Sequence, residues 1–202
     1  MAAKVYIVYY SMNDHVETIA KEILNGVNSV EGVEGKLWKV PETLPDEELD
    51  SLGAARNCCV PIITPTDFIE ADGFIFGFPA RLGTMASQFK GFLETTESSG
   101  KKGHLAGKPA SFFYSSDTPG IGQETSALTA VTLLAHHGMV FVPIGCALTA
   151  EVEVNGGSPY GTTAYTGDGF KQSAFHQGKR TAKIAKQLKE SGIHKKLLEN
   201  DW

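Results

Sequence analysis

Five short hydrophobic runs alternate with segments of helical periodicity, and this alternation restricts the fold more than any other feature of the chain. The first run, residues 5–10, is β-branched and aromatic without polar alternation, as expected of a strand buried on both faces. Apolar side chains then recur at helical spacing at Val16, Ile19, Ala20, Ile23, Leu24 and Val27. A strand, a short loop and an amphipathic helix are typical of the start of a βαβ unit.

The same pattern predicts four more strands and three more helices. The strands are expected at residues 36–40, 73–77, 109–114 and 140–144, and the helices around 89–93, at 125–137 and at 174–189. Each right-handed crossover between parallel strands carries a helix on one face of the sheet. The predicted fold class is therefore α/β, a five-stranded parallel sheet doubly wound with helices on both faces. One domain is expected over residues 1–190, followed by a C-terminal tail at 191–202.

Two long stretches, 41–70 and 146–171, show no clear periodicity. Loops of this length are uncommon unless they are functional, form an interface or contain short elements that the pattern does not resolve. The acidic run at 46–50 is interpreted as a solvated helix.

Composition and charge exclude several classes of protein. With 202 residues, of which 42% are hydrophobic and 20% charged, the chain can bury the core of one globular domain. A net charge of −5 gives no broad basic surface for nucleic acid or an anionic membrane. The apolar run near the N-terminus is too short for a signal sequence or a membrane span. The lysines and arginine of the last helix are interpreted as its wet face.

The three cysteines, Cys58, Cys59 and Cys146, favour a reduced protein. An odd count with two adjacent residues is a poor disulfide framework, and the spacing does not suit zinc. A cytoplasmic location is therefore expected.

Ligands of open α/β sheets bind beyond the carboxyl ends of the strands, so the loops at 11–15, 79–85 and 115–122 are the candidate site. The first loop can cradle a phosphate with its backbone N–H groups, the Ser11 hydroxyl and the following helix N-terminus. A plain helix cap by Ser11, Asn13 or Asp14 explains the same residues equally well.

The other two loops are less specific. A planar ligand can lie against the backbone of 79–85, with Arg81 facing a ring carbonyl or a phosphate, or Arg81 can pair with a surface carboxylate. Residues 115–122 are rich in hydroxyls and glycine, but no Gly-Lys-Ser/Thr follows, so this is not a Walker loop. His136 precedes Gly138, a natural helix C-cap, and its residue context alone favours a capping or packing role. No metal cluster stands out.

Several sequence blocks occur in the order found in one known family: 8–12, 40–44, 76–79, 122–125, 135–139, 142–145 and 156–161. From about Lys4 to Leu188 the chain resembles the WrbA-type NAD(P)H:quinone oxidoreductases, especially the plant flavodoxin-like quinone reductases. The resemblance implies a flavodoxin-like fold, non-covalent FMN, and transfer of two electrons from NAD(P)H to a quinone or another small planar substrate. It also implies a homotetramer or homodimer.

Carried over residue by residue, the resemblance implies FMN contacts from three loops. The first holds the phosphate with Ser11, Met12, Asn13, Asp14, His15 and Val16; the second comprises Pro79, Ala80, Arg81, Leu82 and Gly83; the third comprises Ser115, Ser116, Asp117, Thr118 and Gly120. His136 is the implied catalytic residue, reaching the edge of the ring from the subunit's own pocket.

These loops depart from the usual family sequence. Asn13-Asp14 replaces Tyr-Gly, Ala80 and Leu82 replace Thr and Phe, and Asp117 joins the third loop. A carboxylate about 5 Å from the phosphate, at an effective dielectric of about 20, costs roughly 3 kcal/mol. Such a cost lowers FMN affinity about a hundredfold unless Asp14 points away or is protonated.

Two functions therefore follow from the sequence. The first is an FMN-dependent NAD(P)H:quinone oxidoreductase. The second is a family paralogue that has lost FMN and redox activity and uses the pocket for binding, scaffolding or a different reaction.

Overall fold

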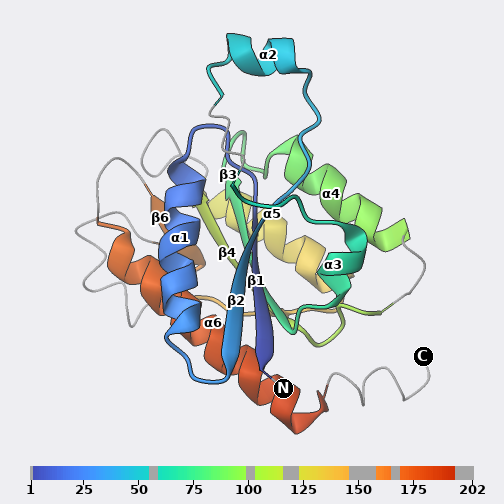
Figure 1. Ribbon diagram of the computed structural model, residues 1–202, viewed down its shortest axis with the longest axis vertical. Helices are drawn as coiled ribbons and strands as arrows, with labels where there is room; N and C mark the ends of the chain where they lie inside the picture. The colour runs from blue at the N-terminus through green and yellow to red at the C-terminus, as the bar shows by residue number, and fades with distance from the viewer. Residues whose placement is uncertain are drawn as a thin grey trace.

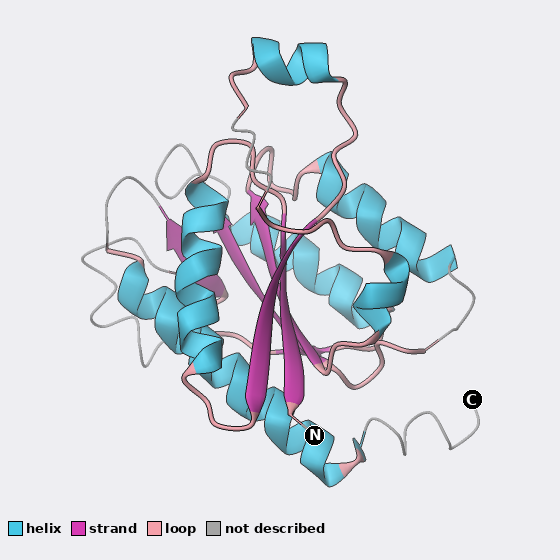
Figure 2. Cartoon of the chain, viewed as in Figure 1, coloured by secondary structure: helices cyan, strands magenta, loops and turns pink. Residues whose placement is uncertain are grey.

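A parallel β-sheet forms the middle layer of the computed structural model, and helices cover both of its faces (Figure 1, Figure 2). The structure describes residues 2–54, 59–98, 103–115, 123–145, 158–164 and 169–193. Within these ranges no helix combines the length and the apolar character needed to cross a membrane.

Five strands follow one another across the sheet in the order β2-β1-β3-β4-β5, and every neighbouring pair is parallel. Their bounds are β1 (Ala3–Tyr9), β2 (Val33–Lys39), β3 (Gly73–Pro79), β4 (Pro109–Ser115) and β5 (Val140–Phe141). β1, β3 and β4 are almost wholly buried, which is why their sequences lack polar alternation. The predicted α/β class and parallel sheet are confirmed.

The fifth position of the sheet is shared by two short strands. β5 pairs with the first two residues of β4, whereas β6 (Gly161–Ala164) pairs with the last four. The predicted strand at 140–144 was too long. Val142 still donates to the carbonyl oxygen of Ala110, but Pro143 has no N–H with which to continue the ladder.

Helices α1 (His15–Asn28) and α6 (Lys171–Ser191) cover one face of the sheet. They cross closely because glycine occupies both contact points. A Cβ on Gly26 would collide with the carbonyl oxygen of Phe175, and one on Gly178 with that of Ile23. The side chain of Gln177 on α6 also holds the sheet together, since it donates to Phe112 O (2.6 Å) and accepts from Thr162 N (2.9 Å).

Helices α3 (Pro65–Ile69), α4 (Ser87–Ser98) and α5 (Gln123–His136) cover the opposite face. Their core is aromatic: Phe68 lies 4.4 Å from Phe74, ring centroid to centroid, and Phe76 lies 5.7 Å from Phe89. The predicted helices at 89–93 and 125–137 are confirmed. The stretch at 41–70 proves to contain α3 and the acidic α2 (Asp46–Ser51), which buries no residue, as expected of a solvated helix.

Charged side chains tie together the edge of the sheet at which the strands begin, here called the amino edge. Asp72 accepts from the backbone N of Lys4 (2.8 Å) and from Lys189 Nζ (2.7 Å). Lys4 Nζ also contacts Glu70 Oε2 at 2.8 Å. Lys108, only 5% exposed, donates from Nζ to the carbonyl oxygen of Ile69 at the end of α3 (2.8 Å). Elements distant in sequence are thereby fixed at this edge.

Candidate functional site

A cavity of about 520 Å³ lies at the opposite edge, where β1, β3 and β4 end, here called the carboxyl edge. Its volume lies in the range of about 300–1,000 Å³ typical of small-molecule sites. The residues that line it are Tyr10, Ser11, Met12, Asn13, His15, Val16, Leu44, Pro79, Ala80, Arg81, Leu82, Thr84, Met85, Ala86, Ser87, Gln88, Lys90 and Ser115. The predicted position of the site, beyond the carboxyl ends of the strands, is therefore a real cavity.

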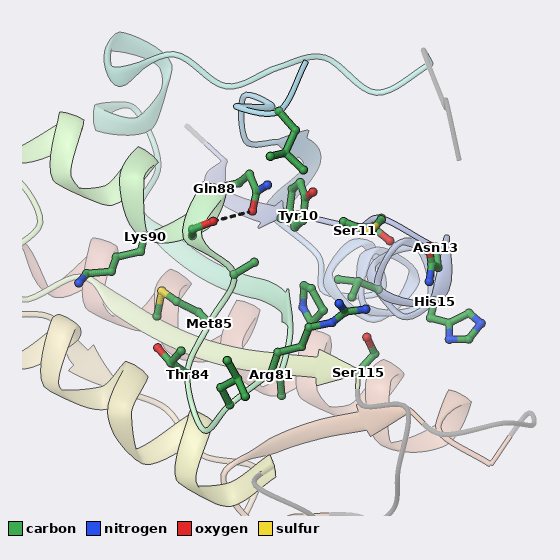
Figure 3. A pocket seen from close by; sticks show the side chains of 18 residues that line it. Tyr10, Ser11, Asn13, His15, Arg81, Thr84, Met85, Gln88, Lys90 and Ser115 are labelled. Carbon is green, nitrogen blue, oxygen red and sulfur yellow. Dashed lines mark hydrogen bonds between the residues drawn. The ribbon is translucent and has the colours of Figure 1, made fainter. Parts of the chain in front are cut away.

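The first predicted loop lies at one end of this cavity, directly before α1 (Figure 3). Ser11 lines the cavity, and its hydroxyl oxygen is buried and has no hydrogen-bond partner among the described residues. Buried polar atoms are nearly always paired, so an orphan beside a helix N-terminus fits an anionic ligand group. Of the three residues that the alternative interpretation names as helix caps, Ser11 and Asp14 make no side-chain cap.

Asp14 occupies a left-handed backbone conformation (φ 51°) immediately before α1. Its carbonyl oxygen accepts from the backbone N (2.8 Å) and the Oγ1 (2.9 Å) of Thr18. This is a conformation that favours glycine, which the family usually has at this position. Asp14 is exposed and does not line the cavity. We therefore expect its like-charge penalty on a bound phosphate to be smaller than a separation of about 5 Å implies.

The second predicted loop crosses the middle of the cavity. Arg81 and Thr84 exchange backbone hydrogen bonds (3.2 and 3.0 Å), which close a tight turn with positive φ at Leu82 and Gly83. Thr129 of α5 holds the turn by donating to the carbonyl oxygen of Gly83 (3.1 Å). In Figure 3 the Arg81 side chain lies between the Ser11 end and the Gln88 end, and it brings a positive charge to the site. Gly83 itself does not line the cavity.

The third predicted loop is described only at its start. Ser115, the last residue of β4, lines the cavity, and its carbonyl oxygen accepts from the backbone N of Ala80 (2.8 Å). Ser116, Asp117, Thr118 and Gly120 lie outside the described residues.

The structure does not bring His136 to the cavity of its own chain. α5 runs antiparallel to the strands, so its last residue, His136, lies near the amino edge, where Gly107 N donates to Gly138 O (2.8 Å) just before β4 begins. His136 is exposed and does not line the cavity. The expectation that it reaches the ring from the subunit's own pocket is therefore not met.

Several lining residues were not predicted: Tyr10, Leu44, Ala86, Ser87, Gln88 and Lys90. Ser87, Gln88 and Lys90 lie in the first residues of α4, and Ala86 directly precedes them. A helix that follows a parallel strand begins at the carboxyl edge, and this rule identifies its first turn as a candidate wall. Nothing in the local sequence marks Leu44, which comes from the connection after β2.

One carboxylate organises the Gln88 end of the cavity. Glu42 accepts from the hydroxyl of Tyr10 (3.0 Å), from Nε2 of Gln88 (3.1 Å) and from the backbone N of Thr43 (2.8 Å) and Leu44 (3.1 Å). Burial alone would raise the pKa of Glu42, but these hydrogen bonds outweigh burial and lower it.

The phenol of Tyr10 responds in the opposite direction. Burial, followed by the hydrogen bond to Glu42, raises the pKa of Tyr10, and the charge of Arg81 opposes this rise. At neutral pH the site therefore holds a carboxylate and a neutral phenol near one arginine. Among the described residues no group of three or more His, Cys, Asp or Glu side chains is arranged to hold a metal ion.

Comparison with known sequences agrees with this site. Residues 64–153 match the family described as NADPH-dependent FMN reductase. The chain is 51% identical to "Quinone-oxidoreductase QR2" of Triphysaria versicolor over 203 residues, which cover 95% of this chain and 99% of that protein. It is 48% identical to "Probable NAD(P)H dehydrogenase (quinone) FQR1-like 2" of Arabidopsis thaliana, over 92% of this chain and 72% of that protein.

Solved structures confirm the flavodoxin-like fold. A flavodoxin, WrbA-like protein from Agrobacterium tumefaciens superimposes with a TM-score of 0.65 at 19% identity, over 92% of this chain and 99% of that one. The flavodoxin of Megasphaera elsdenii gives a TM-score of 0.57 at 19% identity, over 89% and 98% of the two chains. From the fold and the identity over almost its whole length, the chain belongs to the WrbA-type family of flavodoxin-like quinone oxidoreductases.

Proposed function

We propose that this chain is an FMN-dependent NAD(P)H:quinone oxidoreductase that reduces quinones by two electrons. The observation that carries the proposal is the unpaired, buried Ser11 hydroxyl at the α1 end of a cavity that also contains Arg81. Such a cavity fits a ligand that has an anionic group at one end, near Ser11, and a planar group in the middle, near Arg81. The names of the family and of the relatives support FMN, NAD(P)H and quinone as its ligands.

The residues of the chain divide the work of holding FMN. Ser11, Asn13 and the N-terminus of α1 would hold the phosphate. Pro79, Ala80 and Arg81 would hold the ribityl chain and the ring, with the arginine stabilising negative charge. When bound, FMN supplies the hydride and electron chemistry, while the protein orients it and excludes competing reactions.

The predicted homotetramer or homodimer is also proposed for this chain. No charged side chain lies between Glu124 and His136 along α5, although Leu128 on this helix is 51% exposed. The fully exposed Leu82 lies beside this helix at the mouth of the cavity, since Thr129 binds the adjoining Gly83. A helix without a charged outer face suits burial against a second copy.

Assembly would also give His136 access to a bound flavin. Within one chain His136 and the cavity lie at opposite edges of the sheet, so a catalytic contact requires the cavity of another copy. We propose a catalytic role for His136 only in the cavity of a second copy of the chain.

The proposed location is the cytoplasm. The three cysteines, two of them adjacent, suit a reducing compartment, and the described Cys59 is exposed.

Titration of the purified protein with FMN, followed by a NAD(P)H-dependent quinone reduction assay, tests the proposal. Quenching of FMN fluorescence with a dissociation constant at or below about 10 μM is expected, together with consumption of one NAD(P)H per quinone reduced. Retention of FMN without quinone reduction would indicate an electron carrier or a different reaction. No binding at millimolar FMN would instead favour the paralogue that has lost its flavin.

A further inference from the structure

The carboxylate of Glu42 joins three segments of the cavity wall without lining the cavity itself. Its partners are Tyr10 at the end of β1, Gln88 on α4 and the backbone of Leu44, and all three residues line the cavity. Tyr10 is 5% exposed and Gln88 is 6% exposed, whereas Glu42 lies at the surface. Glu42 therefore makes no direct contact with a ligand in the cavity and acts on its shape through the residues that it holds.

The connection after β2 depends on this carboxylate for its position. The last ladder bond of that region runs from Val40 N to Tyr9 O (3.0 Å), and α2 begins only at Asp46. Between these points, among the described residues, the hydrogen bonds that fix residues 42–44 all involve the Glu42 carboxylate. Without it, no hydrogen bond among the described residues would hold Leu44 at the cavity.

The contacts of Glu42 gather at one end of the cavity. In Figure 3 Gln88 lies beside Tyr10, whereas Asn13 and His15 lie at the far end, next to α1. The residues proposed to hold phosphate are thus separate from most of the wall that Glu42 controls.

We propose that Glu42 is a positioning residue that holds Leu44 and Gln88 as a fixed wall of the cavity and thereby sets which quinones the site admits. This inference rests on the proposed function, because it names a determinant of substrate choice at the same site. The lowered pKa of Glu42 keeps the carboxylate ionised at neutral pH, which preserves all four acceptor contacts.

The experiment compares wild type with Glu42→Ala, Glu42→Gln and the control Glu47→Ala. Glu47 lies five residues away on the exposed α2, so its loss changes the net charge equally without touching the cavity. The first measurement is the steady-state kinetics of the FMN-loaded proteins with 1,4-benzoquinone and with the bulkier 2-methyl-1,4-naphthoquinone. The second is hydrogen exchange of the Thr43 and Leu44 amides without FMN.

Glu42→Ala is expected to raise KM for one or both quinones about three- to tenfold, the effect of losing one or two hydrogen bonds. The ratio of kcat/KM between the two quinones should change, while kcat and FMN affinity stay within about twofold. Exchange at Thr43 and Leu44 should accelerate about tenfold or more. Glu42→Gln keeps an acceptor oxygen and should fall between Glu42→Ala and wild type, and Glu47→Ala should match wild type.

Each contrary result contradicts one part of the proposal. If the Thr43 and Leu44 amides exchange at the wild-type rate in Glu42→Ala, Glu42 does not hold this wall, whatever the quinone kinetics show. Faster exchange with unchanged quinone selectivity refutes the role in substrate choice, as does an equal effect of Glu47→Ala. A wild-type protein that neither binds FMN nor reduces quinones refutes the proposed function and the substrate role together, while the exchange data still decide whether Glu42 holds the wall.

Discussion

The two edges of the sheet are built from the same strands but satisfy their polar groups differently. At the amino edge Asp72 binds Lys4 and Lys189, and the buried Lys108 binds the end of α3. At the carboxyl edge the Ser11 hydroxyl is buried without a partner among the described residues, and the backbone turns through positive φ at Asp14 and Leu82.

We infer from this difference that the polar residues of the amino edge stabilise the fold, whereas those of the carboxyl edge bind a ligand. Polar groups paired within the chain contribute to the free energy of unfolding, and breaking one leaves its partner unsatisfied. Unpaired buried groups and strained backbone lower the free energy of unfolding and are typical of binding sites. Substitutions at the amino edge should therefore change stability, and those at the carboxyl edge should change ligand affinity.

The largest expected effect is on the amino edge, at Lys108. Burial lowers the pKa of Lys108 from 10.5 to about 8, so between these values the unfolded chain binds the proton that the folded chain has lost. The contribution of Lys108 to the free energy of unfolding therefore rises with pH between about 8 and 10.5. Relative to Lys108→Met, the free energy of unfolding of wild type should increase by about 2–3 kcal/mol over this window.

Urea denaturation at several pH values measures this difference. Lys183→Met, on the exposed face of α6, is the matched control and should run parallel to wild type. Parallel curves for wild type and Lys108→Met would show that Lys108 titrates normally. FMN affinity should be the same in all three proteins.

On the carboxyl edge, Arg81→Ala should weaken FMN binding about thirtyfold, because it removes a charged contact with the ligand. The free energy of unfolding should change by less than about 0.5 kcal/mol, since Arg81 is exposed. Arg180→Ala, an exposed arginine on α6, controls for the loss of one positive charge. Equal weakening in both variants would mean that long-range charge alone attracts FMN.

Ser11→Ala should weaken FMN binding about tenfold, the value of one hydrogen bond to a charged group. Because the hydroxyl has no partner among the described residues, the stability of the ligand-free protein should stay constant or rise slightly. Thermal unfolding with and without FMN separates the two effects. A loss of more than about 1 kcal/mol without ligand would show that Ser11 serves the fold instead.

The smallest effect is expected for Asp14→Gly. The side chain does not line the cavity, and glycine suits the left-handed backbone, so FMN affinity should change less than about threefold. Fluorescence titration at low ionic strength gives the most sensitive measurement. If FMN bound Asp14→Gly about a hundredfold more tightly than wild type, the like-charge penalty expected from the sequence would be present after all.

Most of the fold could be predicted from the sequence because the buried strands form uninterrupted apolar runs. The fifth strand was overestimated, since the run at 140–144 is apolar throughout but Pro143 stops the ladder. The acidic run predicted α2, whereas α3 is too short for periodicity to reveal, although Thr64 and Asp67 form the capping box that marks its start.

The site residues that directly follow a strand could be predicted from the sequence. Those placed by contacts between distant segments could not. Ser11 and Arg81 follow strands directly, so the carboxyl-edge rule locates them. Gln88 and Leu44 both donate to Glu42, although Gln88 lies 46 residues from Glu42 along the chain. The sequence motif around His136 does not show the direction of α5, which places His136 at the opposite edge from the cavity of its own chain.

Hydrogen–deuterium exchange with and without FMN tests most directly whether the carboxyl edge is the ligand site. FMN should slow exchange in peptides covering residues 10–16 and 79–86 and leave those covering 68–73 and 103–109 unchanged. Protection at 68–73 or 103–109 alone, or no protection at saturating FMN, would contradict the account.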